Sequence, residues 1–509
     1  MTFDFLTEPI TPEFVNKRYM NKKGDTLLIE KIAEDIINSL HIITMRDNEE
    51  MLHYQDGIYH SGGEIRIKEV MGQKMPHWLR GTTLREVMLS IQSRTYRSRD
   101  EIDTDKHLIH LQNGIYNLRT GEFGEFTPDI LSTSKIPVEY DPDAKCPAID
   151  KFMSEVLSKA DNDIIYELLG YCLYRAYPIQ KAIIFVGGGR NGKSVLINLL
   201  TDFIGKSNIS GQALQDLETK QFSTSHLFGK MVNAYPDLSS EGMKTTGVFK
   251  SLVGGDMIPA EKKFKQGFTF RNYAKLIFSC NTLPSTADDT DGYFRRWVIV
   301  NFPNKFEGDN DDKNIIHKIT TPTELSGLFN RAVVELKALL DRGDFSNAET
   351  TEQTRDRYVR MSDSLRAFLT DYVEASSNNH IWKDELYGRY AEYCRDNNYP
   401  LNTTNMVTRR LPEFMRADLN KKTHYTGQKK AWCGIRWKDT DVVEDTGEMT
   451  HTDCMKAVRD CLREGDKTMN ELTTKLNMIE DIKVDSILKK YLSEGDVMVW
   501  ADKYQWVKG

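Results

Sequence analysis

The stretch Lys181-Ala-Ile-Ile-Phe-Val186, followed directly by Gly187-Gly-Gly-Arg-Asn-Gly192-Lys193-Ser194, decides the fold of this chain. The first part is a short apolar run rich in β-branched residues, which is typical of a strand buried on both faces of a parallel sheet. The second part fits the pattern G-x-x-x-x-G-K-[ST] without a mismatch, and Val195–Leu200 continues as a helix. Strand, glycine-rich loop and helix in this order predict an α/β nucleotide-binding domain.

The residues of this loop are suited to bind phosphate and magnesium. Glycines allow successive backbone N–H groups to approach phosphate oxygens, Lys193 can reach the β- and γ-phosphates, and the Ser194 hydroxyl can ligate Mg²⁺. We therefore predict ATP and Mg²⁺ as cofactors. The predicted nucleotide-binding residues are Gly187, Gly188, Gly189, Arg190, Asn191, Gly192, Lys193 and Ser194.

Further strands and helices flank the loop and alternate along the chain, which is the pattern of an α/β protein. We predict strands at Met231–Ala234, Ala274–Cys280 and Val298–Phe302. A helix is predicted at Asp161–Leu173, directly before the first strand.

Polar residues follow two of these strands. Asp237 is the candidate magnesium ligand beside Ser194, and Glu241, the next acid, could orient the attacking water. Asn281 stands at a strand end and could hold the same water beside the γ-phosphate. Asp and Asn are also common in turns and helix caps, so an ordinary structural role stays open for these residues.

A basic turn with one aromatic residue stands between two β-like pieces, at Lys262, Lys263, Phe264 and Lys265. Lysines can contact phosphates and a phenyl ring can stack on a base, so this turn is suited to bind a nucleic-acid strand. A solvated charged turn has the same composition and stays open as an alternative.

Two adjacent arginines, Arg295 and Arg296, precede the strand at Val298–Phe302. A guanidinium group from a neighbouring subunit could stabilise the charge on the γ-phosphate during hydrolysis. A surface salt bridge is the alternative role for this pair.

A length of 509 residues predicts three or four domains. Helices are expected at Leu365–Val373 and Lys383–Asp396, and the last part reads as three helices followed by a hairpin of Val497-Met-Val-Trp-Ala and Tyr504-Gln-Trp-Val. The expected parts are an N-terminal α/β domain (1–165), the ATPase core (166–320), a helical segment (321–363), a winged-helix-like domain (364–438), a linker (439–449) and a second winged-helix-like domain (450–509).

Two hairpins are predicted within the first of these domains. They are centred on Tyr54-Gln-Asp-Gly-Ile-Tyr59 and Gln112-Asn-Gly-Ile-Tyr116. Asp-Gly and Asn-Gly favour the positive φ angles that tight hairpin turns require.

The bulk composition excludes some classes of protein. A net charge of −7 argues against a chain coated in basic charge, although a local basic lining can still bind nucleic acid. The seven cysteines form no CxxC pair, so reduced thiols and no structural zinc are expected. No apolar run approaches the roughly 18 residues of a membrane span, and the N-terminus lacks a secretory pattern. We expect a cytoplasmic protein with no membrane contact.

Taken together and in this order, the motifs resemble those of superfamily 3 helicases. More closely, they resemble the helicase half of phage, plasmid and poxvirus-type primase-helicases. The resemblance rests on Gly187–Ser194, Leu227-Phe-Gly-Lys through Asp237-Leu-Ser, Lys250 through Asp256 with Lys263, Phe278-Ser-Cys-Asn281-Thr-Leu-Pro284 and Phe294-Arg-Arg-Trp297. It extends more weakly upstream, to His110-Leu-Gln-Asn-Gly-Ile-Tyr-Asn-Leu and Glu167-Leu-Leu-Gly-Tyr.

This resemblance implies an AAA+-like core that assembles as a hexameric ring with ATP between subunits. Lys193, Ser194, Asp237 and Asn281 would come from one subunit, and Arg295 or Arg296 from the next. The turn at Lys262–Lys265 would contact single-stranded or forked DNA in the channel, and the family favours 3′-to-5′ travel. For a viral protein the expected location is the host cytoplasm, associated with a nucleoid when on DNA. We find no primase pattern such as Asp-x-Asp with a partner His, so a separate primase or polymerase is expected as a partner.

Two other functions share part of this evidence. A DNA-packaging motor or another P-loop ATPase shares Gly187–Ser194, but it does not predict the basic turn before the Asn281 strand and the arginine pair. An origin-binding initiator would act mainly through its winged helices. DNA-stimulated ATPase with unwinding distinguishes the first alternative, and DNA binding that survives Lys193→Ala distinguishes the second.

Overall fold

The computed structural model describes residues 4–7, 10–261, 267–308, 312–397, 399–415, 417–424, 427–438, 462, 467–468, 497–500 and 503–506. The chain divides into two compact units. The first comprises Met1–Phe368, Trp382–Met415 and Thr423–Lys430, and the second comprises Leu369–Ile381, Arg416–Lys422 and Ala431–Gly509. All residues of the candidate site that the structure describes belong to the first unit.

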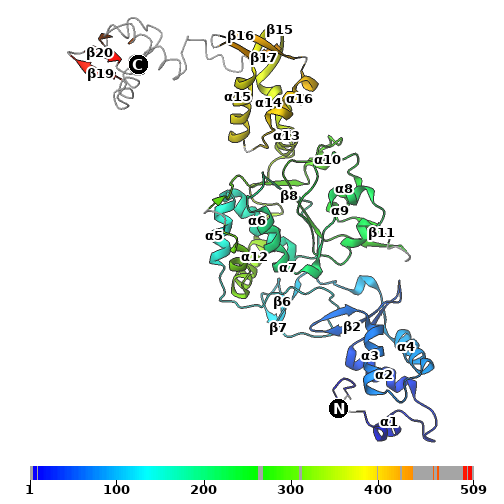
Figure 1. Ribbon diagram of the computed structural model, residues 1–509. Helices are drawn as coiled ribbons and strands as arrows, with labels where there is room; N and C mark the ends of the chain where they lie inside the picture. The colour runs from blue at the N-terminus through cyan, green and yellow to red at the C-terminus, as the bar shows by residue number, and fades with distance from the viewer. Residues whose placement is uncertain are drawn as a thin grey trace. The chain divides into compact units, whose positions relative to one another are not determined.

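A five-stranded sheet forms the centre of the first unit (Figure 1). Its order is β14 (Trp297–Asn301), β8 (Ala182–Val186), β13 (Lys275–Cys280), β10 (Val232–Tyr235) and β9 (Ile209–Ser210), and all neighbours are parallel. Every residue of β8 and β13 is buried, and apolar residues dominate both strands, although β13 also contains Lys275 and Ser279. The four predicted strands are confirmed. The short β9 was not predicted, because two residues show no periodicity.

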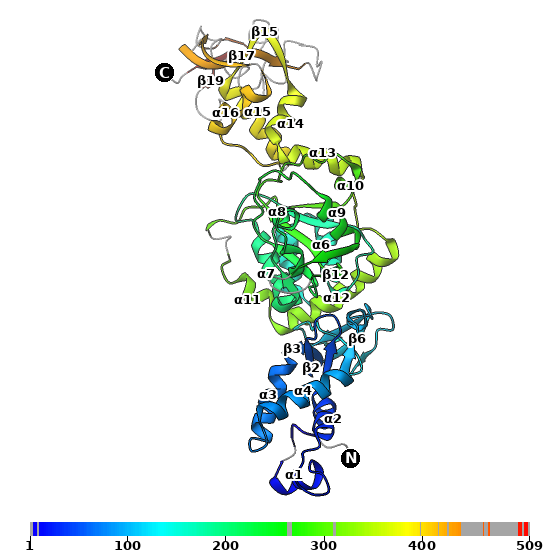
Figure 2. The same cartoon turned by 90° about the vertical axis from the view of Figure 1, so that its right-hand side faces the viewer.

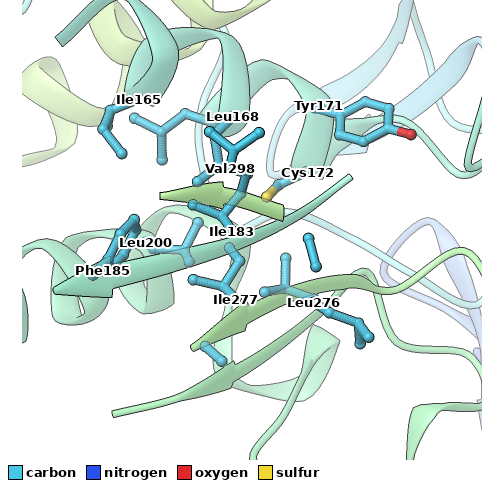
Figure 3. Packing of buried hydrophobic residues seen from close by; sticks show 14 of the residues in the cluster. Ile165, Leu168, Tyr171, Cys172, Ile183, Phe185, Leu200, Leu276, Ile277 and Val298 are labelled. Carbon is cyan, nitrogen blue, oxygen red and sulfur yellow. The ribbon is translucent and has the colours of Figure 1, made fainter. Parts of the chain in front are cut away.

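Helices pack around the sheet and join its strands. Figure 3 shows Leu168 and Cys172 of one such helix, α6, gathered against Ile183 and Val298 of two neighbouring strands. The predicted helix before the first strand is therefore confirmed. The helices of this region are α5 (Pro147–Val156), α6 (Lys159–Leu173), α7 (Lys193–Ile204), α8 (Leu214–Thr219), α9 (Gly247–Gly254), α10 (Asp291–Phe294) and α11 (Ile315–Ile319).

The helical segment after the sheet shares the central core. α12 (Pro322–Arg342) packs beside α6 (Figure 1), and a Cβ atom on Gly170 would lie only 2.2 Å from the Ala332 carbonyl oxygen. This close approach requires glycine at position 170. α13 (Thr351–Ser362) adds Tyr358 and Met361 to the same core. The helices expected at 321–363 are present, packed on the sheet domain.

The N-terminal part has a core of its own. Helices α1 (Pro12–Arg18), α2 (Ile29–Leu40), α3 (Gly63–Lys74) and α4 (Gly81–Thr95) accompany a sheet of order β3 (Ile58–Ser61), β2 (Met51–Gln55), β1 (Ile43–Met45) and β4 (Tyr96–Arg97) (Figure 2). The next strands form a separate sheet of β5 (Leu108–Leu111), β6 (Gly114–Asn117) and β7 (Phe123–Gly124), and side chains of β5 and β6 join the central core.

Both predicted N-terminal hairpins are present, but one turn is shifted. β2 and β3 are joined by Asp56-Gly57, and both residues have positive φ as expected. In the second hairpin Leu111 pairs with Gly114, so the turn is Gln112-Asn113 and the glycine begins β6. The prediction of an Asn-Gly turn was therefore wrong. Gly114 is required for another reason, since its Cβ would lie 2.5 Å from the Gly124 carbonyl oxygen.

The C-terminal part contains both helices and strands. The predicted helices are confirmed as α14 (Ser364–Tyr372) and α15 (Lys383–Asp396), and α16 (Thr404–Phe414) follows. Two three-stranded sheets are described: β15 (Val373–Trp382), β17 (Gly427–Trp437) and β16 (Asp418–His424); and β18 (Lys467–Thr468), β20 (Lys503–Trp506) and β19 (Val497–Trp500). The predicted final hairpin is confirmed as β19–β20. The linker at 439–449 and the three helices expected before this hairpin lie outside the described residues, so the winged-helix assignments stay predictions.

In the part of the chain that the structure describes, no helix is both long and apolar enough to cross a membrane. The five described cysteines are free thiols, and four of them are buried.

Candidate functional site

A cavity of about 680 Å³ lies at the carboxyl edge of the central sheet. The ends of parallel strands meet there, so residues that are distant in sequence become neighbours. Asp237 follows β10, Asn281 follows β13, and the glycine-rich loop follows β8. The predicted residues that line the cavity are Gly189, Arg190, Asn191, Gly192, Lys193, Ser194, Asp237 and Asn281. Gly187 and Gly188 belong to the loop but do not line the cavity.

The loop owes its shape to backbone conformations that favour glycine. Gly192 has a φ of +92°, and a Cβ atom on it would lie 2.7 Å from Val156 Cγ1 of α5. A Cβ atom on Gly187 would lie 2.6 Å from the Phe302 carbonyl oxygen. Arg190 also has a positive φ, of 61°. The glycines at both ends of the loop are therefore required by sterics, apart from any ligand.

The segment after β14 holds the loop in place. The Asn191 side-chain amide donates to the Phe302 carbonyl oxygen at 3.4 Å, and the Phe306 backbone N–H donates to the Arg190 carbonyl oxygen at 2.8 Å. Helix α7 begins within the last two residues of the loop motif, at Lys193. Its first N–H groups lack intrahelical acceptors, so this end of the helix favours an anionic ligand.

Lys193 is a buried cation at the cavity wall, with 6% of its surface exposed. Its Nζ donates to the Gly187 carbonyl oxygen, to Asn191 Oδ1 at 3.3 Å and to Asn281 Oδ1 at 3.5 Å. Burial lowers the pKa of Lys193, while Cys280 and Asp237 act in the opposite direction. Among the described residues no carboxylate forms an ion pair with it. An anionic group in the cavity would therefore supply the missing counter-charge.

Asp237 and Asn281 stand on adjacent strands. β13 lies between β8 and β10, so Asn281 lies between the loop and Asp237 along the sheet edge. The Leu238 backbone N–H donates to the Ser279 carbonyl oxygen at 2.7 Å, which ties the segment after β10 to β13. Ser194 and Asp237 offer a hydroxyl and a carboxylate on the same cavity, which are oxygen ligands suited to Mg²⁺.

The other half of the cavity was not predicted from the sequence. Its walls are apolar side chains from α5, from the segment after β14 and from α11, with charged groups at the margin. These residues are Ala148, Phe152, Val156, Phe306, Ile315, Lys151, Glu155, Asp312 and Lys318. They belong to no motif, and they become neighbours only when the segments before and after the sheet fold together. Their apolar surface is suited to a flat ring such as a nucleobase.

Glu241 is not part of this cavity. Its side chain is exposed, and its backbone carbonyl accepts a hydrogen bond from Gln215 Nε2 at 3.1 Å. The structure brings together Lys193, Asp237 and Asn281 but does not bring Glu241 to them. A water-orienting role for Glu241 remains untested.

The arginine pair lies at the amino ends of the strands, opposite the carboxyl ends where the cavity lies. Arg296 directly precedes β14, and its carbonyl oxygen accepts a hydrogen bond from the Ala182 backbone N–H at the start of β8, at 2.6 Å. The glycine-rich loop follows the far end of β8. With a rise of roughly 3.3 Å per residue, the five residues of β8 separate the pair from the loop by more than about 13 Å.

The two arginines differ in their surroundings. Arg295 is exposed, and its Nη2 donates to Gln180 Oε1 at 3.3 Å. Arg296 is half-buried, its Nη1 donates to the Gly292 carbonyl oxygen, and its buried Nε has no hydrogen-bond partner among the described residues. Arg295 is therefore the more accessible of the two.

The predicted DNA-contacting residues Lys262, Lys263, Phe264 and Lys265 lie outside the described residues. The strands on either side are described: β11 (Met257–Ala260) and β12 (Phe268–Arg271) pair antiparallel, with Ala260 opposite Phe268. The β-like pieces expected around the basic turn are therefore confirmed. Its contact with nucleic acid stays a prediction.

Three family models match separate parts of the chain. Residues 18–158 match a model described as D5 N terminal like, and residues 360–442 match one described as Poxvirus D5 protein-like. Residues 185–296, which include the glycine-rich loop, Asp237 and Asn281, match a family of unknown function, DUF5906.

Curated relatives come from viruses. A putative helicase of Acanthamoeba polyphaga mimivirus is 29% identical over 223 residues, covering 40% of this chain and 22% of that protein. A putative helicase of Invertebrate iridescent virus 3 is 24% identical, covering 66% and 40%. A putative primase of African swine fever virus is 24% identical, covering 58% and 34%. The chain thus spans less than half the length of these relatives.

Among solved structures, the apo C-terminal region of NrS-1 aligns with a TM-score of 0.46 at 10% identity, covering 80% of this chain and 98% of that one. A likeness at this level carries no argument about function. The D5-like segments and the viral relatives, taken together, confirm the resemblance to the poxvirus D5 type of primase-helicase that the sequence motifs predicted.

Proposed function

We propose that this chain is the ATP-driven motor of a viral-type replication helicase, with an AAA+-like core that moves along single-stranded DNA as a ring. The observation that supports it most strongly is the cavity shared by the glycine-rich loop, Asp237 and Asn281. Viral relatives described as putative helicases and primases supply the second support.

The residues around the cavity have separate roles in this proposal. Lys193 neutralises phosphate charge, and Ser194 with Asp237 holds Mg²⁺, which supplies a Lewis acid when bound. Asn281 donates or accepts hydrogen bonds at the water that attacks the γ-phosphate. The apolar wall of Phe152 and Phe306 receives the base. Each role follows from the side chain's chemistry and its place on the cavity wall.

The position of the arginine pair supports a multisubunit site. Arg295 and Arg296 stand across the sheet from the cavity of their own chain, beyond the reach of a side chain. A guanidinium at that edge can stabilise transition-state charge only at the cavity of another copy. The ring, with ATP between subunits and Arg295 as the more accessible finger, is therefore part of the proposal.

DNA is the proposed track. The turn between β11 and β12 contains three lysines and one phenylalanine, a composition that binds single strands through phosphate contacts and stacking. The proposed substrates are single-stranded and forked DNA, with a separate primase or polymerase as partner and with action in the host cytoplasm.

The test is ATPase activity with and without single-stranded DNA, combined with unwinding of a forked duplex. Lys193→Ala should abolish hydrolysis while the protein stays folded, because the Nζ stabilises phosphate charge and lies at the cavity wall. Lys206→Ala, which removes an exposed lysine just beyond the other end of α7, is the matched control and should leave hydrolysis unchanged.

The outcomes separate the alternatives. Hydrolysis close to wild type in Lys193→Ala would remove the basis of the proposal. Hydrolysis that depends on Lys193 but is neither stimulated by DNA nor coupled to unwinding would favour another class of P-loop ATPase.

A further inference from the structure

The turn that carries the arginine pair has little local support of its own. It runs from Thr286 through the four-residue helix α10 to Arg296. A single helical turn is not stable alone, because nucleation costs more than one hydrogen bond returns. The direction in which the arginines point must therefore be fixed by contacts from other elements.

Some of those contacts come from α13, where Arg355 Nη2 donates to Asp291 Oδ1 at 2.6 Å, and others converge on Asp288. Its Oδ2 accepts from Lys250 Nζ at 2.8 Å and from the Thr246 hydroxyl. Its Oδ1 accepts from the Thr290 backbone N–H at 3.0 Å and from the Thr290 hydroxyl at 2.6 Å. The Asp288 side chain is 12% exposed, and that of Lys250 is 32% exposed. Burial raises the pKa of Asp288, but the hydrogen bonds from Lys250, Thr246 and Thr290 outweigh burial and hold the pKa well below its usual range.

The same contacts extend to Arg296. The Tyr293 backbone N–H donates to the Thr290 carbonyl oxygen at 3.0 Å, which begins α10. The next contact is at Gly292, whose carbonyl oxygen accepts from Arg296 Nη1. A Cβ atom on Gly292 would lie 3.7 Å from Arg296 Nη1 and 3.8 Å from Lys250 Cδ. Lys250 and Arg296 therefore both lie close to this one glycine.

Lys250 belongs to α9, and α9 is followed directly by β11. The turn between them includes Gly255 in the left-handed region, with its N–H bonded to the Leu252 carbonyl oxygen. α9 therefore leads directly into the β11–β12 hairpin, and its Lys250 side chain also holds the turn that carries the arginine pair. These two functional segments are attached to one short helix.

We propose that the Lys250–Asp288 ion pair is a positioning device for the arginine pair, which fixes the arginine turn on α9 so that the guanidinium reaches the neighbouring subunit's nucleotide. Neither residue lines the cavity of its own chain. The inference rests on the proposed function, since it assumes that the arginines act across a subunit boundary. It assigns Lys250 and Asp288 to the arginine side of that boundary.

The experiment measures ATP hydrolysis, nucleotide binding and the recovery of hydrolysis in mixtures of two variants. Lys250→Met keeps the side-chain length but removes the charge, and it should lower kcat at least about tenfold, because displacement by about 1 Å can cost a hundredfold. Nucleotide Kd should stay within about twofold of wild type. Lys250→Arg, which can still pair with Asp288, should recover most of the activity. Lys244→Met, at an exposed lysine on the segment before α9, is the control and should behave as wild type.

Mixing identifies the side of the boundary on which Lys250 acts. In oligomers shown to contain both proteins, Lys250→Met with Lys193→Ala should recover part of the hydrolysis, because each supplies the half-site that the other lacks. Lys250→Met with the double mutant Arg295→Ala, Arg296→Ala should not recover, because both defects lie on the same half-site. A role in folding alone would not produce this pattern.

Two results would overturn the inference: unchanged kcat in Lys250→Met, or recovery with the arginine double mutant but not with Lys193→Ala. If Lys250→Met proves unstable by Tm, Asp288→Asn replaces it in the same mixtures, since it keeps the volume and removes the charge. If the arginine double mutant itself fails to complement Lys193→Ala in proven mixed oligomers, the trans arrangement fails, and this inference fails with it.

Discussion

Two ionisable side chains of this protein, Lys193 and His110, are buried in different surroundings. Lys193 faces a cavity, so its lack of a counter-ion within the described residues indicates a place for an anionic ligand. His110 in β5 is 1% exposed and faces no described cavity, and neither ring nitrogen has a hydrogen-bond partner in the described part of the chain. Its ring stacks on the Phe126 ring, with 6.4 Å between the two ring centroids. Burial there is a cost to stability.

That cost predicts a pH dependence. Burial, with a smaller effect from Arg175, lowers the pKa of His110 to about 4 from the ordinary value of 6.5. Between pH 6.5 and 4 the unfolded chain binds a proton at this site and the folded chain does not. Stability from this site is therefore complete above pH 6.5 and is lost as the pH falls to 4, by up to roughly 3 kcal/mol.

The measurement is urea unfolding at several pH values, for wild type and for His110→Phe. The variant keeps a flat ring against Phe126 but cannot be protonated, so its stability should fall less between pH 6.5 and 4. Other histidines titrate in both proteins, and the difference between the two curves isolates His110. Parallel curves would show that His110 is protonated equally in the folded and unfolded states.

At the scale of elements, the sequence predicted the parts that carry a repeating chemical signal. Apolar runs identified β8, β10, β13 and β14, because strands buried on both faces are mostly apolar, although β10 and β13 also hold the buried polar residues Asn233 and Lys275. The glycine-rich loop was found because its pattern is that of phosphate-binding loops, and sterics require glycine at two of its positions, Gly187 and Gly192. Asp237 and Asn281 were found because strand ends meet at one edge of a parallel sheet.

The features that were missed depend on close approach between distant segments. The apolar wall formed by Phe152 and Phe306 has no local sequence pattern. Phe152 precedes the strands of the central sheet in the chain, and Phe306 follows them. The prediction of a turn at Asn113-Gly114 was wrong. Glycine is required at position 114 by the close approach of strand β7, and not by a positive φ. Neither of these contacts leaves a local pattern in the sequence from which it could be predicted.

The β11–β12 hairpin carries the prediction that belongs to this scale. Replacing Lys262, Lys263 and Lys265 with Ala should weaken single-strand binding and flatten its salt dependence, by roughly 0.7 in the log–log slope for each lost phosphate contact. ATPase activity without DNA should persist. The control is a triple alanine variant at the exposed lysines Lys22, Lys31 and Lys68. An unchanged slope, measured by binding over a range of salt concentrations, would indicate a turn that is only solvated.

At the scale of the first unit, one buried ion pair joins the segment after the N-terminal core to the sheet domain. Arg175, just after α6, pairs with Asp103 at 3.1 Å, and their side chains are 4% and 8% exposed. The same guanidinium donates to the hydroxyls of Ser132 and Ser134 and to the Leu108 carbonyl oxygen. Several chain segments therefore depend on one side chain.

Arg175→Met should lower the free energy of unfolding by about 3 to 5 kcal/mol, because removing one partner leaves the Asp103 charge buried and unpaired. The matched control is Arg66→Met, which breaks the exposed pair between Arg66 and Glu69 and should cost less than about 1 kcal/mol. Urea unfolding measures both. Equal losses in the two variants would show that the Arg175 pair is no more important than a surface contact.

The contact of α5 with the glycine-rich loop has a consequence for where this chain can be divided. Val156 packs against Gly192, and Phe152 and Lys151 form one wall of the cavity, although all three precede the glycine-rich loop and the motifs that follow it. A polypeptide beginning at the apolar strand would keep the whole motif string and lose that wall. The smallest portable version of the cavity therefore starts upstream of Pro147, so recombination that exchanges the segments before the sheet domain should preserve the cavity only when the junction falls before this helix.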